Sequence, residues 1–212
     1  MATRPSRSLR TIDDLLRAVR AIAYEFGTDT VFVVGSQAVL ASMPDAPESV
    51  RGSPEIDAFP ANARAWEAKE DAASTDGIKA LASEHIDGLF GAGSQFHRTH
   101  GFYIDGVDDT TARLPDGWGE RAVEVTTEVD GRVVTGVAPA LEDLVVSKLA
   151  RLDPKDRRLV EAVHAHRPLD LREVERRIGL AGLDPASARR AVDFVRGLMP
   201  GPEDAPSGPK AR

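Results

Sequence analysis

The chain has 212 residues, of which 42% are hydrophobic and 29% are charged, and its formal net charge is −7. This length and composition predict a globular protein with a sizeable core, and the negative charge disfavours a protein that coats nucleic acid generally. The absence of cysteine excludes disulfides, thiolate zinc sites and cysteine nucleophiles. Because residues 1–10 lack an apolar signal region and no apolar run is long enough to span a bilayer, we expect a cytoplasmic protein without a membrane partner.

The first predicted element is an amphipathic helix over residues 11–26. Thr11 has the side chain of an N-cap, and Gly27 suits the residue at which the helix ends. The apolar side chains recur at the spacing of one helix face: Ile12, Leu15, Leu16, Val19, Ile22, Ala23 and Phe26. A segment that contains strands follows, up to residue 137.

Two neighbouring motifs in this segment carry most of the chemistry. A strand predicted over residues 30–34 runs into Gly35 and Ser36 and then into a short helix over residues 37–42. Further along, Glu55 and Asp57 flank Ile56 on a short strand, so the two acids share one face while Ile56 faces the core. Paired carboxylates can hold a divalent metal, and a Gly-Ser turn can bind phosphate. This is the layout of a nucleotidyltransferase site.

Each motif also has a simpler interpretation. Two acids at i and i+2 mark the solvent face of many edge strands, and Ser36 can serve only to cap the helix that follows it.

Metal-assisted nucleotidyl transfer uses cations to polarise the α-phosphate and to activate the attacking hydroxyl. Mg²⁺ takes one or two carboxylates together with phosphate oxygens and water, so Glu55 and Asp57 suffice to start a site for Mg²⁺ or Mn²⁺.

The middle of the chain alternates between helix and strand. We predict a helical insertion over residues 62–89, a strand over residues 102–107 and a loop over residues 114–119. A hairpin follows, with strands over residues 122–129 and 132–137 around an Asp-Gly corner that suits a type I′ turn. Alternation along its first strand puts Glu124 with Glu128 on the solvent face, which disfavours Glu124 as a third metal carboxylate.

Residues 139–199 predict helices, and Lys148 stands out among them. In the predicted helix over residues 141–152, Lys148 projects between Leu144 and Leu152, inside the apolar stripe. A lysine there must extend to solvent or find an anion, because an unpaired buried ammonium is very costly. Asp153 and Asp184 each precede a proline, as an N-cap does. Asp156 is a favourable acid near a helix start, a partner for Lys148, or a base toward an acceptor hydroxyl.

Five segments occur in a specific order: GSQAVL, SPEIDAFP, GSQFHRTHGFYIDGV, LPDGWGER and LEDLVVSKLARLDPKD. In this order they resemble a nucleotidyltransferase-like family of unknown function, over roughly residues 11–165. That family is allied to the AbiEii-type toxins of bacterial toxin–antitoxin systems, within the polymerase-beta-like superfamily. The resemblance implies an α+β fold with a mixed-sheet core, which we place in residues 1–138, and a helical C-terminal lobe in residues 139–199. We expect the Pro- and Gly-rich residues 200–212 to be disordered.

The resemblance also implies a metal-dependent nucleotidyltransferase that uses an NTP. The acceptor would be a hydroxyl of RNA, with tRNA as the precedent, or of protein, and the setting a toxin–antitoxin pair with a cognate antitoxin. The pattern of the family falls on one set of residues: Gly35 and Ser36 for the nucleotide, Glu55 and Asp57 for the metal, and Asp57, Lys148 and Asp156 for catalysis.

Two further points stay open at this stage. The resemblance places the segment that contains His97 beside the nucleotide pocket, so His97 is expected to bind the nucleotide; local packing among aromatic side chains is the alternative. Lys148 is expected to bind the nucleotide as well. Two carboxylates without a clear third leave open an inactive nucleotidyltransferase fold that acts as a binding or regulatory module. The C-terminal arginines also allow nucleic-acid binding, although their mixing with acids favours an ordinary solvated surface.

Overall fold

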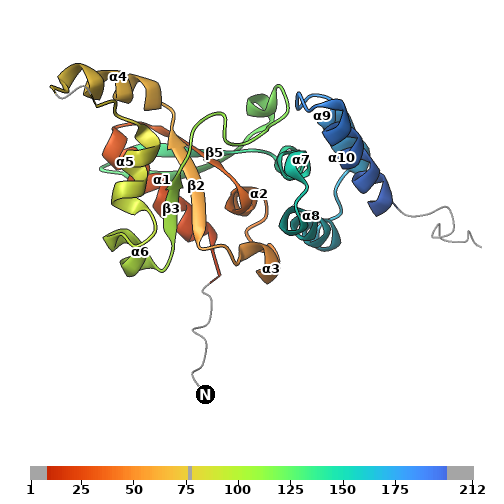
Figure 1. Cartoon of the computed structure of the whole chain (residues 1–212). Coiled ribbons are helices and arrows are strands. Elements are labelled where there is room, and N and C mark those ends of the chain that lie inside the picture. Colours follow the sequence, from red (N-terminus) through yellow and green to blue (C-terminus); the bar gives the residue numbers. More distant parts are fainter. Residues whose placement is uncertain (1–8, 76–77, 200–212) are drawn as a thin grey trace, which may run out of the picture.

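The structure is a computed structural model, and it describes residues 9–75 and 78–199. The predicted disordered segment, residues 200–212, lies outside the described residues. One mixed sheet with helices against it forms the larger part, and the last four helices gather beside one end of that sheet (Figure 1).

The sheet contains five strands in the order β3-β2-β1-β5-β4. β1 runs antiparallel to β2 and parallel to β5, while β2 is parallel to β3 and β4 is antiparallel to β5. The bounds of the strands are β1 (Thr30–Val34), β2 (Glu55–Pro60), β3 (Tyr103–Gly106), β4 (Val123–Val129) and β5 (Arg132–Ala138). The β4–β5 corner has positive φ at both Asp130 (49°) and Gly131 (76°), as a type I′ turn requires.

The helices account for the predicted helical segments. Among the residues that the structure describes, none of these helices is both long and apolar enough to cross a membrane. Their bounds are α1 (Ile12–Phe26), η1 (Ser36–Ala38), α2 (Val39–Ser42), α3 (Glu48–Arg51), α4 (Ala63–Ala73), α5 (Ala82–Phe90), α6 (Gln95–His100), η2 (Trp118–Arg121), α7 (Leu141–Arg151), α8 (Pro154–His166), α9 (Leu171–Ile178) and α10 (Pro185–Leu198). The predicted short helix over residues 37–42 therefore starts as a 3₁₀ turn and continues as α2.

Helix α1 covers one face of the sheet and leaves the other face for the site. Thr11 and Asp14 form the capping box that starts α1, and Gly27 ends it in the left-handed conformation. The apolar stripe of α1 packs on the sheet, and Val19 reaches Gly136 of β5. Ile56 points toward this covered face and is fully buried. Strand alternation then turns the neighbours of Ile56 toward the opposite face.

The C-terminal helices are tied to the segment that follows β3. Buried apolar side chains form one cluster that runs from α1 through the sheet to α7–α10. The backbone N–H of Asp116 donates to the carbonyl oxygen of Leu180, at 2.9 Å. Arg121 and Arg177 both donate to Asp143, whose side chain is fully buried on α7. These contacts hold residues 107–121 beside the helices.

Candidate active site

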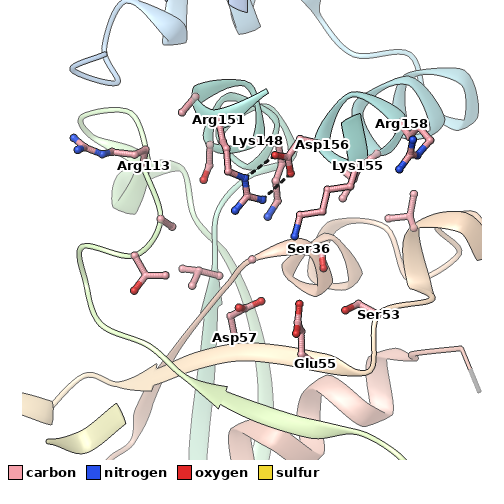
Figure 2. A pocket seen from close by; sticks show the side chains of 18 of the residues that line it. Ser36, Ser53, Glu55, Asp57, Arg113, Lys148, Arg151, Lys155, Asp156 and Arg158 are labelled. Atoms are coloured by element: carbon pink, nitrogen blue, oxygen red, sulfur yellow. Dashed lines mark hydrogen bonds and ion pairs between the residues drawn. The ribbon is translucent and has the colours of Figure 1, made fainter. Parts of the chain in front are cut away.

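A cavity of about 1010 Å³ lies between the open face of the sheet and helices α7 and α8 (Figure 2). It is lined by six of the seven residues that the sequence singled out: Gly35, Ser36, Glu55, Asp57, Lys148 and Asp156. These residues come from two separate stretches of the chain, positions 35–57 and 148–156, and the fold brings them to one place. His97 does not line the cavity.

Gly35 makes room for the carboxylate of Asp57. The register of β1 and β2 pairs Val34 with Asp57, so the turn after β1 passes directly over this side chain. Gly35 has a φ of 70°, and a Cβ atom on it would collide with the Asp57 carboxylate. Only glycine satisfies both requirements at this position.

Ser36 does not cap the helix that follows it. Gly35 occupies the N-cap position, and no side chain caps the turn. The Ser36 hydroxyl instead accepts a long hydrogen bond of 3.4 Å from Gln37 and faces the cavity. Gln37 is fully buried and also donates to the carbonyl oxygen of Val50 at 2.9 Å, which ties the turn to α3. The interpretation of Ser36 as a mere helix cap is therefore wrong.

The two acids of β2 point into the cavity on the same face of the strand, as alternation predicted (Figure 2). Tyr103 donates a hydrogen bond to Glu55 Oε2 at 2.9 Å. Burial, followed by the charge of Glu55, raises the pKa of Asp57 to about 6, while the charge of Lys148 opposes this shift. The pair thus stores like-charge repulsion that a cation would relieve.

Asp105 is the carboxylate that sequence reasoning missed. It is the in-register partner of Asp57 on the parallel strand β3, and burial followed by the charges of Asp87 and Glu55 raises its pKa. The signal was the acid in the predicted strand over residues 102–107, but only the strand pairing puts it beside Asp57. Within the described ranges, no group of three or more His, Cys, Asp or Glu side chains is arranged to hold a metal. Glu124 lies exposed on β4, as predicted.

Lys148 and Lys155 form the basic wall opposite the acids. Helix α7 ends at Leu152 in the left-handed conformation (φ 56°), and Asp153 and Pro154 then start α8. This sharp turn lets both lysines project toward Ser36 and the acids of β2 (Figure 2). Asp153 caps α8 by position only, since its side chain makes no capping bond and pairs with Arg151 instead.

Lys148 is half-buried, as its place in the apolar stripe indicated. Burial lowers the pKa of its ammonium, and the charges of Asp57 and then Asp156 counteract that shift. Among the residues that the structure describes, Lys148 makes no direct hydrogen bond or ion pair. An ammonium held in this way is available to an anionic ligand.

Asp156 pairs with Arg151 and not with Lys148. Its buried carboxylate accepts two hydrogen bonds from the Arg151 guanidinium, at 2.9 and 3.0 Å. These bonds raise the pKa of Arg151. The prediction of a direct Lys148–Asp156 pair is wrong, because Arg151 on the same turn offers two donors in the geometry that a carboxylate prefers.

His97 packs against an aromatic side chain and does not line the cavity. Its Nδ1 accepts a hydrogen bond from the backbone N–H of Gly93 at 3.0 Å, and its ring lies 5.2 Å from the ring of Tyr103. Local packing is thus the role that the structure gives it. The cavity instead contains basic residues that the sequence did not single out, with Arg113 and Arg158 at its sides and Lys155 near its centre (Figure 2). Lys155 was within reach of sequence reasoning, because it directly precedes Asp156.

Comparison with known proteins identifies the family. No curated protein and no solved structure matches the chain. Residues 7–197 match the family described as "Nucleotidyltransferase of unknown function (DUF6036)". The match includes all strands of the sheet, the Gly35–Ser36 turn, the acids of β2 and helices α7 and α8. The chain therefore belongs to this family of nucleotidyltransferases, and its α+β architecture is of the nucleotidyltransferase-like kind.

Proposed function

We propose that the protein transfers a nucleotide from an NTP to an acceptor hydroxyl in a metal-dependent reaction. The observation that carries the proposal is a single cavity in which Glu55 and Asp57 face Lys148 and Lys155. A nucleoside triphosphate concentrates several negative charges in a short chain. It therefore needs a cation between its phosphates and any carboxylate, and cationic side chains around its other end.

The donor set fits a hard divalent cation. Glu55 and Asp57 offer carboxylate oxygens from one face of a rigid strand, and Mg²⁺ and Mn²⁺ prefer such ligands. Burial and then the charge of Glu55 raise the pKa of Asp57 to about 6, and a cation held by both acids would offset the part that comes from repulsion. When bound, the metal would supply Lewis-acid polarisation of the α-phosphate.

The other side chains have separate tasks in this proposal. The hydroxyl of Ser36 donates to a phosphate oxygen, and Lys148 and Lys155 neutralise the terminal phosphates. As the acceptor oxygen bonds to the α-phosphorus, the bond to the bridging oxygen breaks, pyrophosphate leaves and the hydroxyl proton passes to solvent. The negative charge that accumulates on pyrophosphate strengthens the contacts with both lysines in the transition state. Asp156 acts by holding Arg151 at the cavity, since both of its oxygens are engaged there.

Label transfer tests the proposal directly. The protein is incubated with each labelled NTP, with Mg²⁺ or Mn²⁺, and with total RNA or lysate, and we expect label to appear on one class of acceptor. The variant Asp57→Asn should lose transfer and metal-dependent NTP binding while it keeps the parental fold. Asp13→Asn, an exposed acid in the first turn of α1, is the matched control and should behave like the parent. An Asp57→Asn protein that still transfers label would refute the assignment.

One observation favours a second candidate function. Of the four acids that line the cavity, Asp156 is engaged by Arg151 and Asp184 caps α10, and no group of three metal-binding side chains is arranged among the residues described. This arrangement also suits a nucleotidyltransferase fold that binds a metal–nucleotide without turnover and serves as a regulatory module. Metal-dependent NTP binding without label transfer to any acceptor would select this candidate.

The wider proposal concerns the acceptor and the biological setting. The order of the five sequence segments supports a tRNA-like RNA or a protein as acceptor and a place in a toxin–antitoxin pair. Induced expression in bacteria tests the setting, because a toxin arrests growth and Asp57→Asn should abolish the arrest. If the active parent protein does not affect growth, the toxin role is refuted, whereas the proposed nucleotidyl transfer is not.

A further inference from the structure

A second cavity, of about 360 Å³, continues the first one along the same face of the sheet. Val34 and Ala112 line both cavities. Val34 pairs with Asp57 in the register of β1 and β2, and the next pair on this face is Phe32 with Phe59. Since a strand rises by about 3.3 Å per residue, the aromatic pair lies about 7 Å beyond the carboxylate.

Three aromatic side chains form one wall of the second cavity, and ring contacts hold them in place. The rings of Phe32 and Phe59 stack at 5.0 Å, and Trp118 packs its ring against Phe32 at 5.9 Å. Phe59 is buried with Val34 and Val107 in a cluster separate from the main core. The ring contacts fix these side chains before any ligand arrives.

The segment after β3, residues 107–121, lines both cavities and keeps them in a fixed position relative to each other. Arg113 lines the first cavity and Leu114 lines the second. The segment is anchored on both sides of this point, since its start continues β3 and its end is tied to the C-terminal helices. Arg121 donates to the buried Asp143 of α7 at 2.9 and 3.1 Å. A ligand that fills both cavities therefore meets one continuous, preformed surface.

We infer that the second cavity binds the nucleobase of the donor nucleotide, an inference that rests on the proposed function. The cavity with the carboxylates and lysines takes the triphosphate, with its terminal phosphates toward α7 and α8. The sugar and base then extend the opposite way, along β1 and β2, to Phe32 and Trp118. A volume of about 360 Å³ is at the low end of small-molecule sites, roughly 300–1,000 Å³, which suits one planar ring system.

Aromatic stacking explains why this cavity takes a base. Every nucleobase has a π-face, and stacking on an aromatic side chain contributes to binding of all four bases. The affinity difference between Mg-NTP and Mg-tripolyphosphate isolates this contribution, because tripolyphosphate has the charges but no base. For the variant Trp118→Leu, we expect NTP affinity to fall about 5- to 150-fold, while tripolyphosphate affinity stays at the parental value. Phe32→Leu should behave alike, and thermal melts verify that both variants fold.

The two tryptophans of the chain provide a readout that leaves the ligand contacts intact. Trp66 packs against Phe26 and does not line either cavity. In the Trp66→Phe protein, Trp118 is the sole indole, and Mg-ATP should quench its fluorescence whereas Mg-tripolyphosphate should not. The matched control is Trp118→Phe, in which Trp66 is the sole indole and should not respond to either probe.

The outcomes separate this inference from the proposed function. Binding of tripolyphosphate and NTP with equal affinity, and with no Trp118 response, overturns the base subsite and leaves the phosphate site standing. If neither NTP nor tripolyphosphate binds in the presence of metal, both the base subsite and the phosphate site are refuted. If Trp118→Leu weakens the binding of a single-stranded oligonucleotide but not of NTP, the second cavity binds a base of the acceptor. That result overturns the assignment to the base of the donor nucleotide.

Discussion

At the scale of single residues, the site depends on Gly35 and Asp57, because the Asp57 carboxylate occupies the place that a side chain at position 35 would need. Gly35 has a φ of 70°, and a Cβ atom on it would overlap Oδ2 of Asp57. The first requirement disfavours any other residue, and the second excludes even the smallest side chain. The turn that we propose to bind phosphate and the strand that we propose to bind metal are thus in direct contact, because Gly35 has no Cβ atom.

Replacement of this glycine should weaken the proposed metal site first. In Gly35→Ala, the added methyl group displaces the Asp57 carboxylate, so we expect at least tenfold weaker metal-dependent NTP binding and a loss of about 1–3 kcal/mol of stability. Isothermal titration and chemical denaturation measure the two effects. Gly27→Ala is the control, because Gly27 also has a positive φ but its Cβ would meet no atom within 4 Å. It should lose stability without losing ligand affinity.

The pKa of Asp57 predicts a pH dependence of stability. Since the pKa rises from 3.8 to about 6 on folding, the folded state binds this proton more tightly, and the ionised carboxylate costs stability as pH rises through that window. The Asp57→Asn variant should therefore gain on the parent between about pH 4 and about pH 7, by up to about 3 kcal/mol. Denaturation across this range checks the sign. A constant difference would show that Asp57 has no raised pKa.

The same group should control ligand binding with the opposite sign. Only the ionised carboxylate holds a cation, so metal-dependent NTP affinity should rise with pH through about 6 and then level off. Titrations with Mg-ATP at a series of pH values measure it. The binding of Mg-ATP to Asp57→Asn should be weak at every pH, and an unchanged midpoint in that variant would point to another group.

At the scale of elements, a buried ionic group joins α7, α9 and the segment after β3. Asp143 has no exposed side-chain surface and accepts hydrogen bonds from Arg121 and Arg177. Glu173 in turn accepts from Arg177, so the arginines are oriented from several sides. This group determines where the segment that carries Arg113 and Trp118 sits relative to the cavity.

Removal of the central acid should be costly. Asp143→Ala leaves two arginines without their buried partner, and we expect a loss of about 3–5 kcal/mol in the free energy of unfolding. The matched control, Glu161→Ala, changes an exposed helical acid on α8 and should stay within about 0.5 kcal/mol of the parent. Denaturant titration compares them, and equal stabilities of the two variants would contradict the structural role of Asp143.

At the scale of the whole molecule, the cavity exists because α7 and α8 are placed over the open face of the sheet. Lys148 contributes to that cavity from the apolar side of α7 and makes no direct polar contact within the described residues. Its ammonium is desolvated in the free protein, so its charge costs stability until an anion arrives. The position therefore links folding energy to ligand binding.

Lys148→Met tests this link. Asp156 is hydrogen-bonded to Arg151, so removal of the lysine breaks no hydrogen bond among the described residues. Because burial outweighs the favourable charge of Asp57 at Lys148, the melting temperature should stay the same or rise. The additional stabilisation by Mg-NTP should fall strongly, together with activity. The control is Lys69→Met, an exposed lysine on α4. A Lys148→Met protein with parental melting and parental response to Mg-NTP would exclude Lys148 from the site.

The elements and the site motifs followed from local patterns. The capping box of α1, the alternation around Ile56 and the type I′ corner at Asp130 each depend on residues a few positions apart, which a sequence displays directly. The position of Lys148 within an apolar stripe was visible for the same reason. The partner of Asp156 was not visible, because Arg151 and Lys148 lie on the same helix shortly before Asp156 and either could pair with it.

Long-range pairing decided the rest. The sequence by itself determined the acid-bearing face of β2, because side-chain direction in a strand depends only on alternation. It also showed the Gly35–Ser36 turn, and the α+β class followed from the order of the five segments. The tertiary structure alone placed Asp105 beside Asp57, moved His97 outside the cavity and joined Phe32, Phe59 and Trp118 into one wall. These relations depend on strand order and register, which the packing energy of the whole chain selects and no local pattern encodes.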